Sequence, residues 1–295
     1  DLQRLDKPVA KRIVSKISWL YPDPQQSNRH QYMPKRTKKL IVYLDQNFIS
    51  DMAKADSKRN VKPQFKQIYE LLHKGFLDEK IVVPASWFHD VETSLSVELK
   101  EKIVSYQNYL GQVRLIFPEN VRRAQIIAYA SKFRGRNADP LSIDIAFQEN
   151  PDKRTRMLNV VVDSQLQSFD FKTSRTQTAQ ALENLRQKIV SSNTTYHEQL
   201  KIELTDHRRF CLEEHYHELI DLFAGDKHNL SEFLESDTFR NIPVIDISSK
   251  LWSSVLTHFK KRVIKSSDGT DIDIISTYLP YIDVFATDAF MADRI

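Results

Sequence analysis

The first segment with a strong hydrophobic pattern covers residues 40–44, where five consecutive side chains read Leu-Ile-Val-Tyr-Leu. A short apolar run rich in β-branched and aromatic residues is typical of a strand that is buried on both faces. The run stops at Asp45, and Gln46 and Asn47 follow it. We therefore predict a buried strand with a carboxylate at its C-terminal end, although Asp-x-Asn also suits a turn or a helix N-cap.

The pattern that follows this strand alternates between helix and strand. The stretch 63–75 has helical periodicity, with a proline near its first turn and a glycine at its end, so we predict a helix there. A second apolar strand is predicted at 81–83, where Pro84 ends it, and Ser86 is placed to cap the next helix. Strands that alternate with helices in this way predict a parallel sheet.

The same alternation returns near the C-terminal end of the chain. We predict a strand at 242–246, a helix that begins at Asp271, and a last strand over 283–286. The stretch 113–119, which reads VRLIFPE, competes with 242–246 for the third position in the sheet. We prefer 242–246, because a helix and then an acidic residue follow it in order.

The chain between these two parts has a different pattern. Residues 95–240 show helical periodicity and many charges, so we predict a mostly helical insertion there. The core of the fold, which contains the predicted sheet, would then consist of 40–94 and 241–295, on either side of the insertion. Residues 1–39 form a basic N-terminal arm, for which packing on the body and contact with a phosphate backbone both remain open.

Composition narrows the classes of protein to consider. The chain contains 41% hydrophobic residues, enough for a core, and five glycines with no GxGxxG motif, which disfavours a glycine-rich phosphate loop. A single cysteine, Cys211, excludes an internal disulfide framework and suits a reducing compartment. No apolar run is long enough to span a bilayer, so we expect a cytoplasmic protein with no membrane partner. The net charge of +4 does not by itself indicate nucleic acid.

Four acidic residues occupy equivalent places in the predicted topology. Asp45 follows the first strand, Glu92 lies in the helix after the second strand, Asp271 opens the helix before the last strand, and Asp288 follows that strand. In an open parallel sheet these positions converge at the C-terminal edge. Each acid alone is explained by a helix N-terminus, which favours negative charge. The recurrence of four acids in this order favours a common site.

Three blocks of the chain, YLDQNFIS, VVPASWFHDVETS and TDIDIISTYLPYIDVFATD, resemble the signature blocks of PIN-like nucleases. The resemblance covers about 40–94 and 241–295, somewhat over a third of the chain. It implies an α/β fold, a three-layer α/β/α sandwich with a central parallel sheet, here with a large mostly helical insertion. It also implies an acidic cluster that holds Mg²⁺ or Mn²⁺ and cleaves RNA.

The resemblance assigns the four acids, Asp45, Glu92, Asp271 and Asp288, as the catalytic and metal-binding residues. Carboxylates suit this role because Mg²⁺ prefers oxygen ligands. A second group is predicted to lie beside these acids, where its members could position metal-bound water or contact a substrate phosphate. Turn and cap hydrogen bonds are the alternative role for several of them. The group consists of Asn47, Ser86, His89, Asp273 and Thr287. A basic group is placed where a phosphate backbone would enter the site: Lys260, Lys261, Arg262 and Lys265.

The expected function is a metal-dependent endoribonuclease, with tRNA or mRNA as the class of substrate. By analogy with the family, a toxin or an antiviral-defence effector fits this activity. The insertion would supply substrate choice, contacts with a second copy of the chain, or a surface for a regulatory protein. Two alternatives remain open. One is a catalytically silent PIN-like scaffold that binds RNA or a protein, and the other is a structure-specific DNA nuclease.

Overall fold

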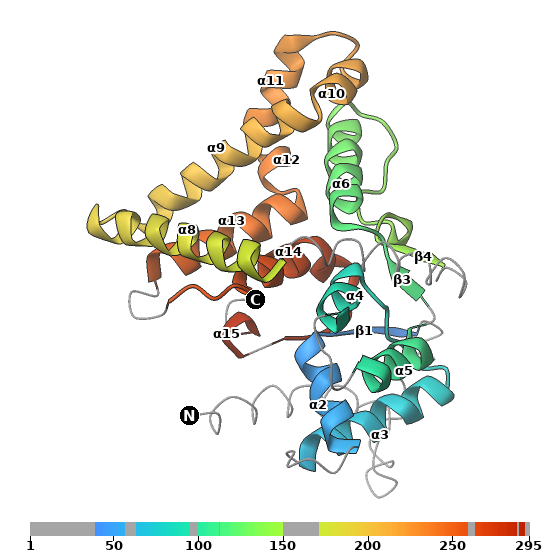
Figure 1. Ribbon diagram of the computed structural model, residues 1–295. Helices are drawn as coiled ribbons and strands as arrows, with labels where there is room; N and C mark the ends of the chain where they lie inside the picture. Colours follow the sequence, from blue (N-terminus) through green and yellow to red (C-terminus); the bar gives the residue numbers. More distant parts are fainter. Residues whose placement is uncertain are drawn as a thin grey trace, which may run out of the picture. The chain divides into compact units, whose positions relative to one another are not determined.

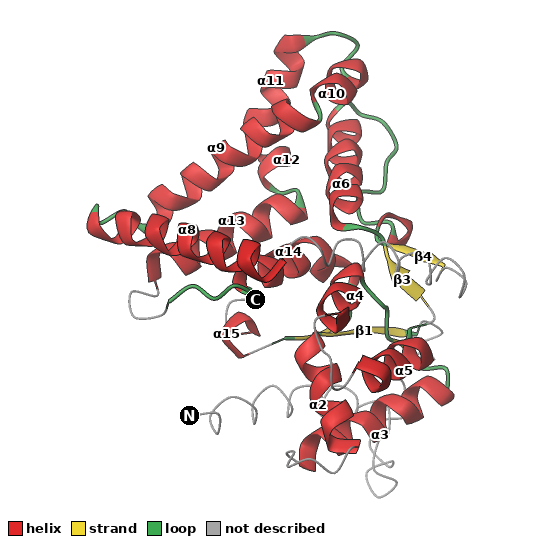
Figure 2. Cartoon of the chain, viewed as in Figure 1, coloured by secondary structure: helices red, strands yellow, loops and turns green. Residues whose placement is uncertain are grey.

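The computed structural model describes residues 39–56, 63–94, 100–111, 113–149, 171–258, 263–287 and 289–292. In these residues the chain is mostly helical and contains a small parallel three-stranded sheet (Figures 1 and 2). Its contacts divide it into two units. The sheet unit consists of the described residues within 1–115, 147–163 and 281–295, and the helical unit consists of those within 116–146 and 164–280. The predicted basic arm lies outside the described residues, apart from Lys39.

The central strand of the sheet unit is β1 (Leu40–Leu44), and all five of its residues are buried. It pairs in parallel with β2 (Ile81–Val82) on one side and with β5 (Val284–Ala286) on the other, which gives the strand order β2-β1-β5. The prediction of a buried strand at 40–44 is confirmed. Burial on both faces explains why this strand reads as a continuous apolar run rather than an alternating one.

The helices of the sheet unit are α2 (Gln46–Asp56), α3 (Pro63–Leu77), α4 (Trp87–Ser94), α5 (Lys100–Leu110) and the short α15 (Ala289–Ala292). The predicted helix 63–75 is confirmed and continues two residues further. Val42 and Leu44 of β1 belong to one hydrophobic cluster with Ile68 and Leu72 of α3 and Ile103 of α5. The same cluster includes residues of α2, so it fixes α2, α3 and α5 against the sheet.

The stretch 113–119 contains a strand, β3 (Val113–Leu115), which pairs antiparallel with β4 (Phe147–Glu149) in a second, two-stranded sheet. Ala85, just after β2, also bridges β3 in parallel: the Ala85 N–H donates to the Val113 carbonyl (2.9 Å), and the Leu115 N–H donates to the Ala85 carbonyl (2.8 Å). The preference for 242–246 over 113–119 was therefore wrong, because the described strand beside β2 comes from 113–115.

Residues 242–246 lead into a helix, α13 (Pro243–His258). Pro243 occupies its first position, where a missing N–H costs no hydrogen bond, and proline is rare in a central strand. Val244, Ile245, Ser248 and Ser249 are buried at helical spacing. Packing of α13 against α9 and α14 overrides the β propensity of the Val-Ile-Asp-Ile run.

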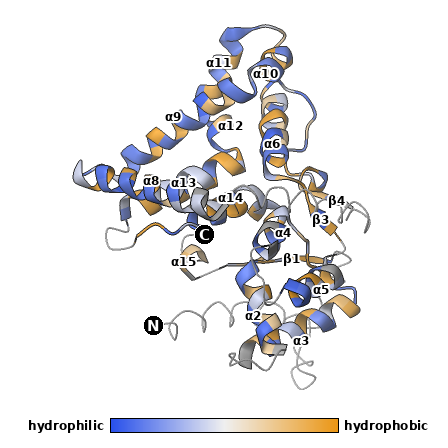
Figure 3. Cartoon of the chain, in the orientation of Figure 1, coloured by the Kyte–Doolittle hydropathy of each residue, from blue (hydrophilic) through white to orange (hydrophobic). Residues whose placement is uncertain are grey.

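The helical unit contains α6 (Pro118–Phe133), α8 (Phe171–Ser191), α9 (Tyr196–Glu214), α10 (Tyr216–Leu222), α11 (Lys227–Glu235), α12 (Asp237–Arg240), α13 and α14 (Asp268–Tyr278). Phe223, Phe233 and Phe239 are fully buried and lie in one cluster with residues of α6 and α13. Hydrophobic and hydrophilic residues interleave along α9, as Figure 3 shows. This colouring reflects one face packed on α13 and one exposed face.

The two units do not follow the predicted division of the chain. Residues 100–115, expected in the insertion, belong to the sheet unit, and 243–280, expected in the core, belong to the helical unit. The extensive packing of α13 against α9 explains the second difference. In the part of the chain that the structure describes, no helix combines the length and the hydrophobicity needed to cross a membrane.

Candidate functional site at the end of the central strand

Asp45 lies at the junction between β1 and α2 and is buried. Its N–H donates to the Ala286 carbonyl of β5 (2.9 Å), and its own carbonyl accepts from the Phe48 N–H (2.9 Å). The residue thus ends the sheet ladder and starts the helix. Asn47 donates from Nδ2 to Asp45 Oδ2 (3.2 Å), so one carboxylate oxygen has a fixed direction. The predicted placement of Asp45 at the C-terminal end of a buried strand is confirmed.

The end of β5 lies beside the end of β1. Leu44 is in register with Ala286, so the buried Thr287 follows β5 at the level of Asp45. Asp288, the next predicted acid, lies outside the described residues. Asp283 is at the opposite end of β5, where it exchanges two bonds with Ile41: its carboxylate accepts from the Ile41 N–H (2.9 Å), and its N–H donates to the Ile41 carbonyl (3.0 Å). Asp283 therefore stabilises the pairing of the strands.

Glu92 is half-buried on α4, and Ser86 caps the start of this helix. Ser86 Oγ accepts from the His89 N–H, and the Ser86 N–H donates to His89 Nδ1, both at 3.2 Å. This reciprocal pair has the geometry of a capping box, with histidine in place of the usual glutamate. The predicted N-cap role of Ser86 is confirmed, and the box fixes the direction in which α4 leaves the sheet.

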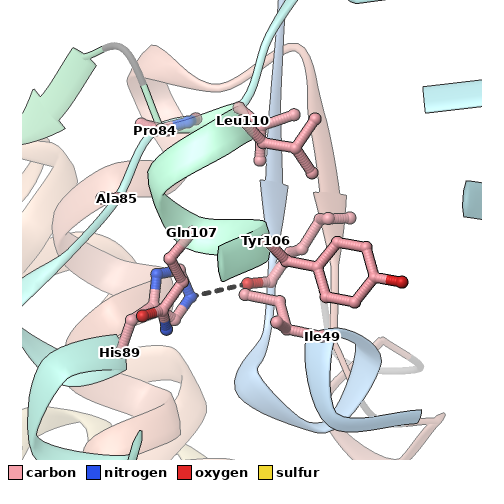
Figure 4. Close-up of a pocket in the computed structure, with 10 residues that line it drawn as sticks. Ile49, Pro84, Ala85, His89, Tyr106, Gln107 and Leu110 are labelled. Atoms are coloured by element: carbon pink, nitrogen blue, oxygen red, sulfur yellow. Dashed lines mark hydrogen bonds between the residues drawn. The ribbon is translucent and has the colours of Figure 1, made fainter. Parts of the chain in front are cut away.

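His89 joins α4 to the end of β1. Because Nδ1 accepts from the Ser86 N–H, Nε2 carries the ring proton and donates to the Leu44 carbonyl (2.7 Å), the bond drawn as a dashed line in Figure 4. The ring stacks on Tyr43, with centroids 5.1 Å apart. Burial lowers the pKa of His89 from 6.5 to about 4, so the imidazole is neutral at pH 7. Both ring nitrogens are engaged within the protein, which leaves neither for the predicted contact with a substrate phosphate.

A second connection runs from α4 to α2 through side chains that the sequence did not single out. Gln46 donates from Nε2 to Thr93 Oγ1, and Gln107 of α5 donates to the same oxygen, both at 3.0 Å. Gln46 and Thr93 are buried. The available signal was positional, since Gln46 directly follows Asp45, and Thr93 lies one helical turn after His89 on the same face of α4.

A third connection joins α4 to β3. Asp90 and Arg114 form an ion pair in which Arg114 is largely buried. Arg114 is the central residue of β3. Sequence reasoning missed this pair because its two members are far apart in the chain. The ion pair, together with the bonds of His89 and Thr93, holds an eight-residue helix to four other elements of the sheet unit, β1, α2, α5 and β3.

A small hollow lies next to His89. Its wall is mainly apolar and includes Ile49, Pro84, Tyr106 and Leu110 (Figure 4). The space is comparable to that of a single water molecule, so it does not accommodate a substrate. This hollow is therefore not a candidate for the substrate site.

The remaining predicted residues belong to the helical unit or lie outside the described residues. Asp271 is half-buried in the first turn of α14, which begins at Asp268 rather than at Asp271. Asp273, two residues further, forms an ion pair with Arg122 of α6 (3.5 Å). Lys265 is exposed. The other predicted basic residues, Lys260, Lys261 and Arg262, lie outside the described part of the chain.

The sheet unit offers hard oxygen donors for a divalent cation. Asp45 and Glu92 supply carboxylates of the kind that Mg²⁺ and Mn²⁺ prefer, and Asn47 orients one of the oxygens. The donor chemistry therefore fits a cation of this class. Among the residues that the structure describes, which exclude Asp288, no group of three or more His, Cys, Asp or Glu side chains is arranged to hold a metal ion.

Comparison with known proteins found no match for this chain. No family model matches the chain, and no curated protein or solved structure matches it. The function is therefore inferred from the residues, from their resemblance to the PIN-like blocks, and from the geometry at the end of β1.

Proposed function

We propose that this protein is a metal-dependent nuclease of the PIN-like class, with RNA as its substrate. The observation that carries the proposal is the position of Asp45, which directly follows the central strand of a parallel sheet and is buried beside the end of β5. Ligand sites of open parallel sheets lie at this edge. The connection of α4 to the same strand end through His89 and Leu44 supports a role for Glu92 there.

In this proposal Asp45 and Glu92 hold Mg²⁺ or Mn²⁺. The resemblance assigns Asp271 as a further direct ligand and Asp288 as an acid that acts through water, and both assignments stay predictions. A bound divalent cation would supply an activated water and neutralise charge on the scissile phosphate. The described side chains have separate tasks: Asn47 orients Asp45, and the neutral His89 holds α4 in place without contacting the substrate.

The proposed function includes a PIN-like three-layer sandwich, a cytoplasmic location, and a substrate such as tRNA or mRNA. A toxin or a defence effector would use such an activity. The parallel order β2-β1-β5 supports the sandwich, and an isolated parallel bridge between Ala85 and Arg114 links the chain after β2 to β3. Regulation by a protein partner or by self-association is part of the same family analogy.

The test is cleavage of labelled total RNA, tRNA, single-stranded DNA and flap-containing DNA by the full chain, with Mn²⁺, with Mg²⁺ and with EDTA. We expect cleavage of RNA that requires the metal and that Asp45→Asn reduces at least about a hundredfold, because the amide keeps the volume but removes the ligand charge. Asp283→Asn is the matched control, since Asp283 lies at the other end of β5.

The outcomes separate the proposed function from its rivals. Preference for flap-containing DNA over RNA would move the assignment to a structure-specific DNA nuclease. A folded wild-type chain that cleaves nothing but retains RNA in a filter-binding assay would indicate a silent scaffold. Equal activity of Asp45→Asn and the wild type would overturn the assignment of the site.

A further inference from the structure

The residues on either side of Asp45 bond to residues on either side of Glu92. Leu44, which precedes Asp45, accepts from His89 Nε2 (2.7 Å). Gln46, which follows Asp45, donates to Thr93 Oγ1 (3.0 Å). His89 lies one turn before Glu92, and Thr93 directly follows it. The His89–Leu44 and Gln46–Thr93 hydrogen bonds thus flank both carboxylates and involve no carboxylate atom. These two bonds are called the bracket below.

Both bonds of this bracket lie in the protein interior. His89, Gln46 and Thr93 are all buried, and His89 is only 2% exposed. Hydrogen bonds in such a low-dielectric setting are stronger than in water, and loss of one partner leaves the other unsatisfied. The Tyr43 ring, stacked on His89 at 5.1 Å, restricts the imidazole further. The bracket is therefore stiff compared with ordinary surface contacts.

The geometry points to His89 as a positioning residue which, together with the Gln46–Thr93 bond, sets the separation of the Asp45 and Glu92 carboxylates before a cation binds. This inference rests on the proposed function. Two ligand carboxylates at one site repel each other when no cation lies between them. α4 has only eight residues, so its own hydrogen bonds give it little resistance to displacement. The bracket supplies that resistance.

A purely structural role makes a different prediction. If His89 only filled space, an aromatic side chain of similar shape would replace it without consequence for metal binding. His89→Phe keeps a ring that stacks on Tyr43 but removes both the donor to Leu44 and the acceptor for the Ser86 N–H. His89→Gln retains an amide N–H that can donate to Leu44.

The test measures Mn²⁺ binding to the full-length chain by electron paramagnetic resonance, alongside the Mn²⁺ concentration for half-maximal RNA cleavage. We expect His89→Phe to raise the Mn²⁺ dissociation constant and the Mn²⁺ concentration for half-maximal cleavage about tenfold each, because residues that hold metal ligands in place typically contribute this much to affinity. Maximal cleavage should be largely recovered at saturating Mn²⁺. His89→Gln should lie closer to the wild type. Circular dichroism and the melting temperature establish that each variant is folded.

Two further variants keep the inference falsifiable. Tyr43→Phe keeps the ring that stacks on His89 and both bonds to Leu44 and Thr93, while it removes a hydroxyl whose contact with Ser86 Oγ is long (3.4 Å), so it should bind Mn²⁺ as the wild type does. If His89→Phe does not fold, Gln46→Met breaks the other bond of the bracket at similar volume, and it should also raise the Mn²⁺ midpoint.

The results distinguish this inference from the proposed function. A folded His89→Phe, or failing that a folded Gln46→Met, with the Mn²⁺ affinity of the wild type would overturn the positioning role and leave the nuclease assignment intact. A wild-type chain that neither binds Mn²⁺ nor cleaves RNA would overturn both.

Discussion

The two units treat their buried polar side chains differently. In the sheet unit, buried Gln46, Ser86, His89 and Thr93 all have hydrogen-bond partners, and the Gln46–Thr93 and His89–Leu44 bonds join separate elements. In the helical unit, five buried side-chain atoms of the described residues have none: Arg122 Nε, Gln199 Oε1, Ser249 Oγ, Ser253 Oγ and Thr277 Oγ1. All such atoms among the described residues belong to the helical unit.

This difference shows where polar groups specify the structure. A buried polar group with a hydrogen-bond partner stabilises the fold and fixes the orientation of the two side chains. A buried polar group without a partner costs desolvation free energy that no hydrogen bond offsets. The sheet unit places its paired groups around Asp45 and Glu92, where the position of a carboxylate matters to the proposed function. The helical unit depends on aromatic packing around Phe223, Phe233 and Phe239, which tolerates a few unpaired hydroxyls.

The largest expected loss of stability concerns the ion pair between Glu183 and Arg186. This pair is buried and well hydrogen-bonded although it belongs to the helical unit. Both side chains are 8% exposed, and Glu183 also accepts from the Ile264 N–H (3.1 Å). We expect Glu183→Gln to lower the free energy of unfolding by about 2 kcal/mol, since it weakens several bonds to one charged group. Urea denaturation at pH 7 measures the change.

The same pair predicts a pH dependence. Hydrogen bonds from Arg186 lower the pKa of Glu183 from 4.5 to about 2. Its contribution to stability is therefore complete above pH 4.5 and is lost as the pH falls through about 2. The difference between wild type and Glu183→Gln should shrink over this range. Glu213→Gln, which breaks an exposed pair with Arg209, is the control and should change stability by less than about 0.5 kcal/mol at any pH.

A smaller loss is expected from Thr93→Val in the sheet unit. Valine has the shape of threonine but no oxygen, so the buried Gln46 amide loses its acceptor. We expect a loss of about 1.5 kcal/mol in the free energy of unfolding, measured by urea denaturation. An unchanged stability would mean that the paired polar groups of the sheet unit are no more important than the unpaired groups of the helical unit.

The smallest effect has the opposite sign. Ser249→Ala and Ser253→Ala remove buried hydroxyls that have no partner, so each should raise the free energy of unfolding by about 1 kcal/mol. Ser254→Ala on the same helix controls for helix propensity alone, because Ser254 is only partly buried. A melting temperature that falls in the first two variants would contradict the difference between the units.

The sequence by itself determined the elements whose signals are local. The buried run 40–44, the proline and glycine around 63–75, and the cap at Ser86 predicted β1, α3 and the start of α4, because burial periodicity and cap chemistry depend on neighbours in the chain. The position of Asp45 after a central strand followed from the same pattern.

Only the tertiary structure decided the remaining assignments. The run at 242–246 became a helix because its apolar side chains pack against α9 and α14, while 113–115 became a strand because Ala85 and β4 supply backbone partners. The role of His89 depended on the Leu44 carbonyl, which lies 45 residues earlier in the chain. Hydrogen bonds and packing between distant segments leave no periodic trace in the sequence, so local patterns do not predict them.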